Sequence, residues 1–547
     1  MTPMTSPSSI PPPIANTLWV ASCLPEWRRF QGAANAIRET QAGWLAACLR
    51  GNQNSQYGQR HSFDTIHSPQ EYQRRVPLTS YDDYTDQIAR IGAGQPNVLT
   101  AAPVRMFELS SGSAAASKLI PYTDALKAEF QRGLAPWIYN LYTHIPDLQR
   151  GPAYWSVTPL VEGKRFTSGG IPIGFESDSA YLGPLGKWLV ESALAVPDSV
   201  KLAPDVDSFR YQTLLHLLRH RDLRLISVWN PTFLTLLLDA LKEFWDRLLD
   251  DIERGTSAPH SPDPQLGHAL RACSPTEPES LWPRLGLLSC WADGPSAPYA
   301  ARLREIFPHA TMQAKGLLAT EAFVSFPLVG VEGSVLAIRS HFFEFMDTSG
   351  ECLLAHQIEK GKTYSVVITT GGGLYRYQLH DMIEVIGHWR QIPCIRFVGK
   401  ADHISDWFGE KLDERFVAGV FEQVFAAHDL SPAFAMLAPH NSGGFCYQLY
   451  IESKAIPTSL AKALDQALRE NFHYDYCRKL GQIGPLQITQ VTDGAQTYLY
   501  ACHARGQRLG NIKPGVLQKT SDWAVYFKTS CLDQNQTNYG KIPENRT

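Results

Sequence analysis

A loop of small and hydroxyl-bearing residues, Ser110 to Lys118, is the first segment whose composition suits a chemical task. It follows an alternating run at Val104–Leu109 and comes before Thr123, a residue type that favours the start of a helix. Such a loop can hold a phosphate, because small side chains let backbone N–H groups approach the oxygens. A plain flexible loop fits the same composition, and the Gly-Lys-[Ser/Thr] of P-loop NTPases is absent. The candidate phosphate ligands are Ser110, Ser111, Gly112 and Ser113.

A threonine and a glutamate end the segment Lys315–Glu321, which reads KGLLATE. The hydroxyl of Thr320 can hydrogen-bond a nucleotide, and Glu321 can hold Mg²⁺ through a carboxylate oxygen. A helix-capping threonine beside a solvated glutamate would explain the same pair without a ligand.

Three glycines, Gly371–Gly373, separate a strand-like run from two aromatic residues that flank Arg376. Asp381 follows, just before another strand-like run at Met382–Ile386. A carboxylate at a strand edge suits two vicinal hydroxyls, such as those of ribose, and an arginine suits phosphate. A structural ion pair between Arg376 and Asp381 is the competing explanation.

Two lysines complete the set of candidates. Lys411 ends the segment FGEK, which follows RFVGKADH at Arg396–His403, and Lys513 lies in NIKP near the C-terminus. A single surface lysine is usually only a solvated charge.

Taken in this order, the five segments resemble the acyl acid amido synthetases of the Gretchen Hagen type, the auxin-responsive group of the adenylate-forming enzyme superfamily. The resemblance runs from about Trp44 to Lys513 and includes Gly169–Gly183 and Ser227–Leu237. The phosphate loop departs from the family pattern, since Ser113 and three alanines stand where threonine and glycines are usual. Lys400 also replaces an arginine, which keeps the charge but loses the bidentate geometry.

The resemblance implies that ATP, with Mg²⁺, lies in a cleft between a large and a small domain. Glu321 would also approach the Mg²⁺, and Asp381 would bind the ribose hydroxyls. Lys411 and Lys513 would act as catalytic lysines that reach the phosphates from the small domain. The residues expected to bind ATP or AMP are Ser110, Ser111, Gly112, Ser113, Ala319, Thr320, Glu321, Asp381 and Arg376.

On this resemblance we expect an ATP-dependent acid–amino acid ligase. A carboxylic acid would be activated as an acyl-adenylate and then transferred to an amine. Two alternatives stay open: a ligase that transfers the acyl group to coenzyme A or another thiol, and a degenerate nucleotide-binding sensor. Trp229 and Phe233 are weak candidates for walls of the acyl pocket, with core packing as the competing explanation.

The composition narrows the range of partners. The chain has 547 residues, 44% of them apolar, and 50 basic against 53 acidic residues give a net charge of −3. This balance gives no reason to expect nucleic acid or a membrane as partner, and the small-molecule acid and amine substrates are implied by the resemblance. No cationic segment precedes an apolar stretch at the N-terminus, and no apolar run is long enough to span a bilayer. Ten scattered cysteines without a C-x-x-C pair indicate reduced thiols, so we expect a cytoplasmic protein.

The helical and strand patterns of the segments that must position these residues predict an α/β (α+β) fold. Residues 1–14, rich in Pro, Ser and Thr, are expected to be a disordered lead-in. Residues 15–398 mix helical and strand patterns, and the resemblance implies that they form a large N-terminal adenylation domain of mixed sheets and helices. Residues 399–547 alternate short strands and helices over most of their length, which predicts a smaller α+β domain. The resemblance implies that this domain is mobile.

Overall fold

The computed structural model describes residues 10–110, 118–156, 165–174, 183–255, 261–400, 404–405, 407–408, 410–441, 444–479, 481–505, 507, 512 and 515–527. The chain divides into two compact units. The larger comprises Met1–Asp402 and Cys502–Pro514, and the smaller comprises His403–Ala501 and Gly515–Thr547. The segment Cys502–Pro514 therefore returns to the larger unit, whereas the sequence predicted one boundary near residue 399.

The larger unit begins with a helix earlier than its composition suggested. Helix α1 starts at Pro12, inside the stretch 1–14 that was expected to be disordered. Proline is tolerated in a first helical turn, because the N–H that it lacks would have no partner there. Trp19, Trp27 and Phe30 bury one side of this helix. Residues 1–9 lie outside the described residues.

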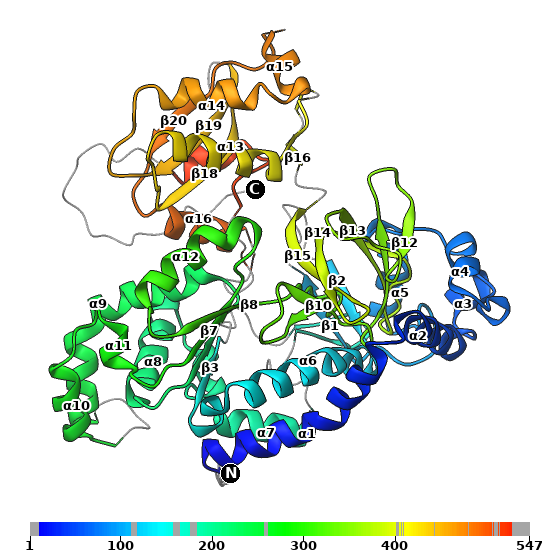
Figure 1. Ribbon diagram of the computed structural model, residues 1–547, viewed down its shortest axis with the longest axis horizontal. Helices are drawn as coiled ribbons and strands as arrows, with labels where there is room; N and C mark the ends of the chain where they lie inside the picture. The colour runs from blue at the N-terminus through cyan, green and yellow to red at the C-terminus, as the bar shows by residue number, and fades with distance from the viewer. Residues whose placement is uncertain are drawn as a thin grey trace. The chain divides into compact units, whose positions relative to one another are not determined.

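Helices of the larger unit surround its sheets (Figure 1). They are α1 (Pro12–Ala33), α2 (Ile37–Asn52), α3 (Gln56–Arg60), α4 (Pro69–Arg75), α5 (Thr85–Gly92), α6 (Asp124–His144), α7 (Gly183–Ala193), α8 (Val206–Arg219), α9 (Pro231–Arg254), α10 (Pro264–Arg271), α11 (Pro278–Leu281) and α12 (Ala297–Ile306). Among the described residues, none of the helices in either unit is both long and apolar enough to cross a membrane.

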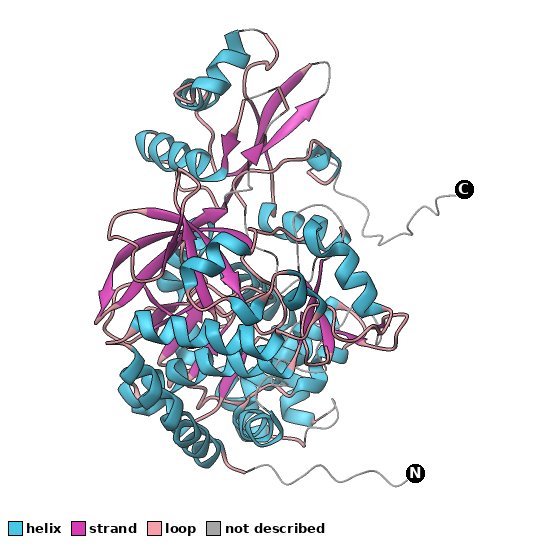
Figure 2. Ribbon diagram, turned by 90° about the vertical axis from the view of Figure 1, so that its right-hand side faces the viewer, coloured by secondary structure: helices cyan, strands magenta, loops and turns pink. Residues whose placement is uncertain are grey.

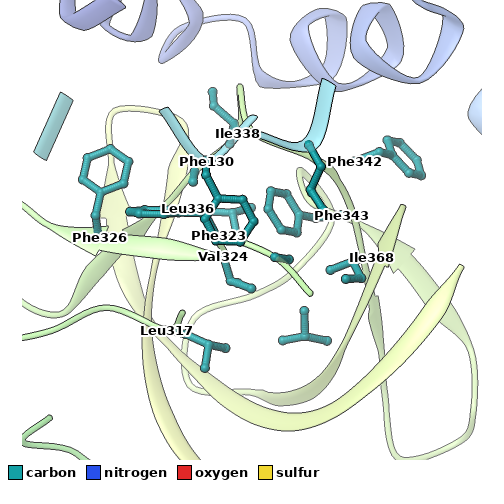
Figure 3. Packing of buried hydrophobic residues seen from close by; sticks show 14 of the residues in the cluster. Phe130, Leu317, Phe323, Val324, Phe326, Leu336, Ile338, Phe342, Phe343 and Ile368 are labelled. Atoms are coloured by element: carbon teal, nitrogen blue, oxygen red, sulfur yellow. The ribbon is translucent and has the colours of Figure 1, made fainter. Parts of the chain in front are cut away.

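An antiparallel sheet carries the aspartate and glycine candidates. Its described strands run in the order β12-β11-β13-β14-β15-β10-β9. They are β9 (Ser325–Pro327), β10 (Ser334–Leu336), β11 (Phe342–Met346), β12 (Cys352–Leu354), β13 (Thr363–Thr369), β14 (Tyr377–Trp389) and β15 (Ile392–Lys400). Figure 3 shows the core at this sheet, where Phe130 of α6 lies edge-on to Phe323 with ring centroids 6.1 Å apart.

A parallel sheet of order β3-β6-β7-β8 lies in the same unit. Its strands are short, and they are β3 (Ala153–Trp155), β6 (Leu225–Ser227), β7 (Leu287–Cys290) and β8 (Thr311–Ala314). Leu225 and Leu287 pack into one hydrophobic cluster, whereas Ile226 and Leu288 pack into the other. Both faces are therefore buried, as is usual for parallel sheets. All four strands point the same way, so their carboxyl ends share one edge.

A third sheet, of order β2-β1-β5-β4, frames the phosphate-loop candidate. Its strands are β1 (Met106–Ser110), β2 (Lys118–Tyr122), β4 (Arg165–Phe166) and β5 (Pro172–Ile173). Ser110 pairs with Lys118 across the antiparallel β1 and β2. The loop therefore joins two strands, and the helix expected after it, α6, begins only after β2, where Thr123 accepts a capping hydrogen bond from Leu126 N–H.

The smaller unit packs helices against an antiparallel pair of strands extended by one parallel strand. Its sheet has the order β18-β19-β20, and a separate pair is β16-β17. The elements are β16 (Ile404–Ser405), β17 (Leu412–Asp413), α13 (Glu414–Ala427), β18 (Phe434–Asn441), β19 (Phe445–Glu452), α14 (Leu460–Leu468), α15 (Phe472–Lys479), β20 (Gln487–Gln490) and α16 (Gly494–Ala504), the last of which ends in the larger unit. Figure 2 shows helices and strands mixed throughout, and the predicted fold class is confirmed.

Candidate active site

A tight hairpin turn presents Thr320 and Glu321. The backbone groups of Ala319 and Ala322 hydrogen-bond to each other in both directions, at 3.0 and 3.3 Å, so Thr320 and Glu321 occupy the two central positions. The hydroxyl of Tyr122, at the end of β2, donates to Thr320 O. The turn that the sequence analysis singled out is thus held by its own backbone hydrogen bonds and by the hydroxyl of Tyr122.

A buried relay joins this turn to the glycine segment. His341 Nε2 accepts a hydrogen bond from Phe323 N–H at 3.0 Å, so the ring proton lies on Nδ1. Nδ1–H then donates to Glu129 Oε2 at 2.9 Å. The same carboxylate accepts the N–H of Gly371, at 3.1 Å to Oε1 and 2.9 Å to Oε2. Glu129 and His341 therefore fix the two chemistry-bearing segments in one arrangement.

The three glycines serve packing. A Cβ on Gly371 would lie 2.4 Å from Glu129 Oε1, closer than side chains approach. Gly373 has φ +97°, a conformation that residues with a side chain rarely adopt. Thr123 Oγ1 also donates to Gly371 O at 2.7 Å, so the segment is bound to the start of α6.

Asp381 lies within β14, whereas the sequence placed it just before a strand. The pairing of β13 with β14 shifts register between Val367↔Gln378 and Ser365↔Met382, so the residues between them bulge out of the ladder. His380, inside this bulge, has φ +59°. Bulges of this kind re-aim a side chain and are frequent next to active sites.

The carboxylate of Asp381 has an unsatisfied oxygen. Asp381 is 3% exposed, and its buried Oδ1 has no hydrogen-bond partner among the described residues. Lys400 Nζ, from the paired position on β15, lies 3.7 Å from that oxygen. Buried polar atoms are nearly always hydrogen-bonded, so an orphan at this bulge is suited to a ligand that brings donors.

Charged residues at the bulge affect the pKa of Glu321 in the turn. Burial raises the pKa of Glu321, Lys400 opposes the shift, Asp381 adds to it and Lys118 opposes it more weakly. A divalent cation beside Glu321 would favour its ionised form. The donor set thus fits the expected ATP and Mg²⁺.

Arg376 has a different role from the one predicted. Its guanidinium donates to Glu344 in a bidentate pair, with Nη2 at 2.9 Å and Nε at 3.0 Å from the carboxylate. Nη1 donates to the backbone oxygens of Gln73 and Val76. The side chain is therefore committed to holding the N-terminal segment on the sheet and is not placed for a phosphate. Because Arg376 forms its ion pair with Glu344, the alternative prediction of an ion pair between Arg376 and Asp381 is also wrong.

Lys411 occupies an exposed turn of the smaller unit. Its backbone has φ +45°. The preceding Glu410 is fully buried and accepts hydrogen bonds from Trp407 N–H and Phe408 N–H. The hydroxyl of Tyr447 donates to Glu410 at 2.6 Å. Glu410 thereby anchors the turn and leaves the Lys411 side chain in solvent.

Two acyl-pocket candidates separate in the structure. Phe233 packs against Phe209, with ring centroids 6.3 Å apart, in the cluster around α8 and α9. Trp229 is half-buried at the carboxyl end of β6, 5.9 Å from Trp291. Packing thus accounts for Phe233, whereas Trp229 lies at an edge where ligands of parallel sheets bind.

Asn230 is a residue that the sequence reasoning missed. Its Oδ1 accepts the N–H of Thr232 and caps α9, and its Nδ2 donates to Ile512 O at 2.6 Å. An asparagine before a helix-opening proline does signal a cap, but nothing local in the sequence signals the second contact. Ser111, Gly112, Ser113 and Lys513 lie outside the described residues.

Matches to known families account for most of the chain. Residues 26–312 match the GH3 family N-terminal domain, 334–400 the GH3 family central domain and 421–522 the GH3 family C-terminal domain. The N-terminal match alone covers more than half of the chain. The chain belongs to the GH3 family. The predicted family is confirmed, and so is its ligase class.

The matches to two curated GH3 relatives cover most of each relative's length. Indole-3-acetic acid-amido synthetase GH3.3 of Arabidopsis thaliana is 24% identical over 454 residues, which is 75% of this chain and 73% of the relative. Indole-3-acetic acid-amido synthetase GH3.8 of Oryza sativa subsp. indica is 24% identical over 467 residues, 77% of this chain and 74% of the relative.

Solved structures agree on the fold of this GH3 chain. AtGH3.15 acyl acid amido synthetase in complex with 2,4-DB superimposes with a TM-score of 0.80 at 20% identity, covering 96% of this chain and 97% of that one. A 2-hydroxyisobutyryl-CoA ligase in the postadenylation state reaches a TM-score of 0.51 at 10% identity, covering 89% and 90%.

Proposed function

We propose that this protein uses ATP and Mg²⁺ to activate a carboxylic acid as an acyl-adenylate and then transfers the acyl group to the amine of an amino acid. The observation that carries the proposal is the buried Oδ1 of Asp381, which has no hydrogen-bond partner among the described residues and lies at a strand bulge, 3.7 Å from Lys400 Nζ. Two vicinal hydroxyls of a ribose would supply the donors that this carboxylate lacks. Membership of the GH3 family, whose relatives are named as amido synthetases, supports the same chemistry.

Residues of the chain bind the nucleotide and meet the charge that develops as the two steps of the reaction proceed. Asp381 accepts the ribose hydroxyls and fixes the nucleotide, while the turn at Thr320 faces its α-phosphate side. The acid forms a bond from one carboxylate oxygen to the α-phosphorus as the bond to pyrophosphate breaks. The amine nitrogen then bonds to the acyl carbon, the bond to AMP breaks, and the amine releases a proton to solvent. Lys411 and Lys513 meet the phosphate charge that develops in the first step.

Glu321 is the residue that would hold Mg²⁺. The cation, when bound, supplies charge stabilisation at the phosphates.

The cysteines among the described residues are free thiols, which supports the cytoplasmic location that we propose.

The first test is exchange of radiolabelled pyrophosphate into ATP, measured with a panel of carboxylic acids. We expect exchange only when a suitable acid is present, because reversal of the first step requires the acyl-adenylate. Intact ATP binding without exchange across a broad panel would rule out adenylation. For the accepted acid, mass spectrometry with free amino acids and coenzyme A supplied together should then find the amide. A thioester as the main product would favour the thiol-transfer alternative.

The substitution Asp381→Asn should weaken ATP binding without unfolding the protein. The amide replaces one acceptor oxygen with a donor, and losing a charge-assisted hydrogen bond costs about 1.5–3 kcal/mol. Calorimetric titration with ATP measures the change, and Asp239→Asn, an exposed position on α9, serves as the control. Unchanged ATP affinity in Asp381→Asn would mean that this carboxylate has a structural role.

A further inference from the structure

Three adjacent strands of the parallel sheet place two tryptophans and a lysine at one edge of the sheet. Strands β6, β7 and β8 end in register, and the chain continues from them into Trp229, Trp291 and Lys315. Backbone hydrogen bonds extend the register beyond the strands: Trp291 N–H donates to Trp229 O, and Lys315 N–H donates to Cys290 O, both at 2.8 Å. This is the edge at which α/β sheets bind ligands.

The ammonium group of Lys315 lies inside an aromatic cage at this edge. Its Nζ is 4.8 Å from the ring centroid of Trp229 and 5.1 Å from that of Trp137, which comes from α6. Nζ donates to Ser227 Oγ at 2.7 Å, and Lys315 is only 6% exposed. Two indole faces favour a cation at this point.

Lys315 is buried, and it makes no ion pair with any carboxylate of the described residues. Burial lowers the pKa of Lys315 to about 7, and the one titratable group acting on it, Cys290, opposes that shift. A buried ammonium is costly without a counter-ion. A methionine would fill the same space without that cost, so the amine is explained best by an anion that arrives with a ligand.

The position of Lys315 sets it apart from the reacting centre. From Lys315 the chain runs along one arm of the hairpin, where Leu317 O accepts from Val324 N–H, and reaches Thr320 at the tip. Five residues in a strand-like arm correspond to about 13–16 Å. Lys315 is therefore separated from the turn at Thr320 by the length of one hairpin arm.

We propose that Lys315 determines the specificity of the acid-binding site by binding a second anionic group, at the end of the acid remote from the activated carboxylate. The inference rests on the proposed function, since it names the substrate class of the same site. The indole faces of Trp137 and Trp229 suit a planar body, so the class is an aromatic acid that carries a second acidic group.

The test compares phenylacetate with 4-carboxyphenylacetate, which differ only in the second carboxylate. At pH 8 the free amine is largely neutral, so the diacid should bind with uptake of about one proton, seen by calorimetry in two buffers of different ionisation enthalpy. We expect the protein to prefer the diacid by about 10–100-fold. Lys315→Met should remove both the preference for the diacid and the proton uptake, and Lys315→Gln repeats the test with a polar side chain in case the Lys315→Met protein folds poorly.

The outcomes separate the two proposals. Equal affinity for both acids would overturn the role of Lys315. Exchange with phenylacetate but not with the diacid would likewise overturn it and leave adenylation standing. Diacid binding with proton uptake, but without pyrophosphate exchange from either acid, would support the Lys315 site and count against adenylation of this substrate class.

Discussion

Replacing Lys513 with alanine should lower the rate of ATP–pyrophosphate exchange by about 10²–10³-fold, the scale for one preorganised donor, while ATP affinity changes little. The expected contact is with charge that develops between the α-phosphate and the leaving pyrophosphate. Such an interaction is stronger in the transition state than in the ground state, so its loss appears in turnover. Exchange kinetics and ATP calorimetry on the same variant measure the two quantities.

The residue before Lys513 supports this expectation. Ile512 O accepts a hydrogen bond from the buried Asn230, which fixes that point of the chain at the carboxyl end of β6. Lys454→Ala, at an exposed position in the smaller unit, is the matched control and should leave exchange unaltered. A change below about twofold in Lys513→Ala would identify a solvated charge, and equal losses in rate and affinity would assign Lys513 to ground-state binding.

The substitution Glu344→Gln should lower the free energy of unfolding by about 3–5 kcal/mol, because it leaves the Arg376 guanidinium buried without its counter-ion. The side chains of Arg376 and Glu344 are 7% and 1% exposed, and Gln73 also donates to Glu344. Denaturant unfolding followed by tryptophan fluorescence measures the change.

Two further variants make this second experiment decisive. Arg396→Met removes an exposed pair with Glu332 and should cost less than about 1 kcal/mol. The double variant Arg376→Met with Glu344→Met should lose less stability than the sum of its single changes, since it strands neither charge. If Glu344→Gln proved no more harmful than Arg396→Met, the buried pair would contribute little to the fold.

Local patterns predicted the elements better than the placement of side chains. The periodicity of α9 and α14 is visible in the sequence, because one apolar stripe repeats along each helix. The bulge that re-aims Asp381 depends on β13, and the packing of Gly371 depends on Glu129, 242 residues away. Such features are set by tertiary contacts, so neighbouring residues carry no signal of them.

The candidate site shows the same division. The turn at Thr320 and Glu321 and the carboxylate of Asp381 were predicted because residue type and order resemble a family, and their roles stay predictions. Arg376 was misassigned, since a lone arginine beside aromatic residues does not show whether its anion is a phosphate or Glu344. His341 was missed because a buried histidine acquires meaning only from the two groups on its ring nitrogens.

The relay through Glu129 and His341 also has a consequence for how the chain reaches its native state. It closes loops of 212 and 242 residues, whereas the contact between His341 and Phe323 spans only 18. Loop-closure entropy makes the 242-residue closure costlier than the 18-residue one by about 2 kcal/mol. Contacts of such long range form slowly, after hairpins such as β13–β14 can already exist. We therefore expect the hairpin turn of Glu321 to form early, and the contacts of Glu129 and His341 that hold it against the glycine segment to form late.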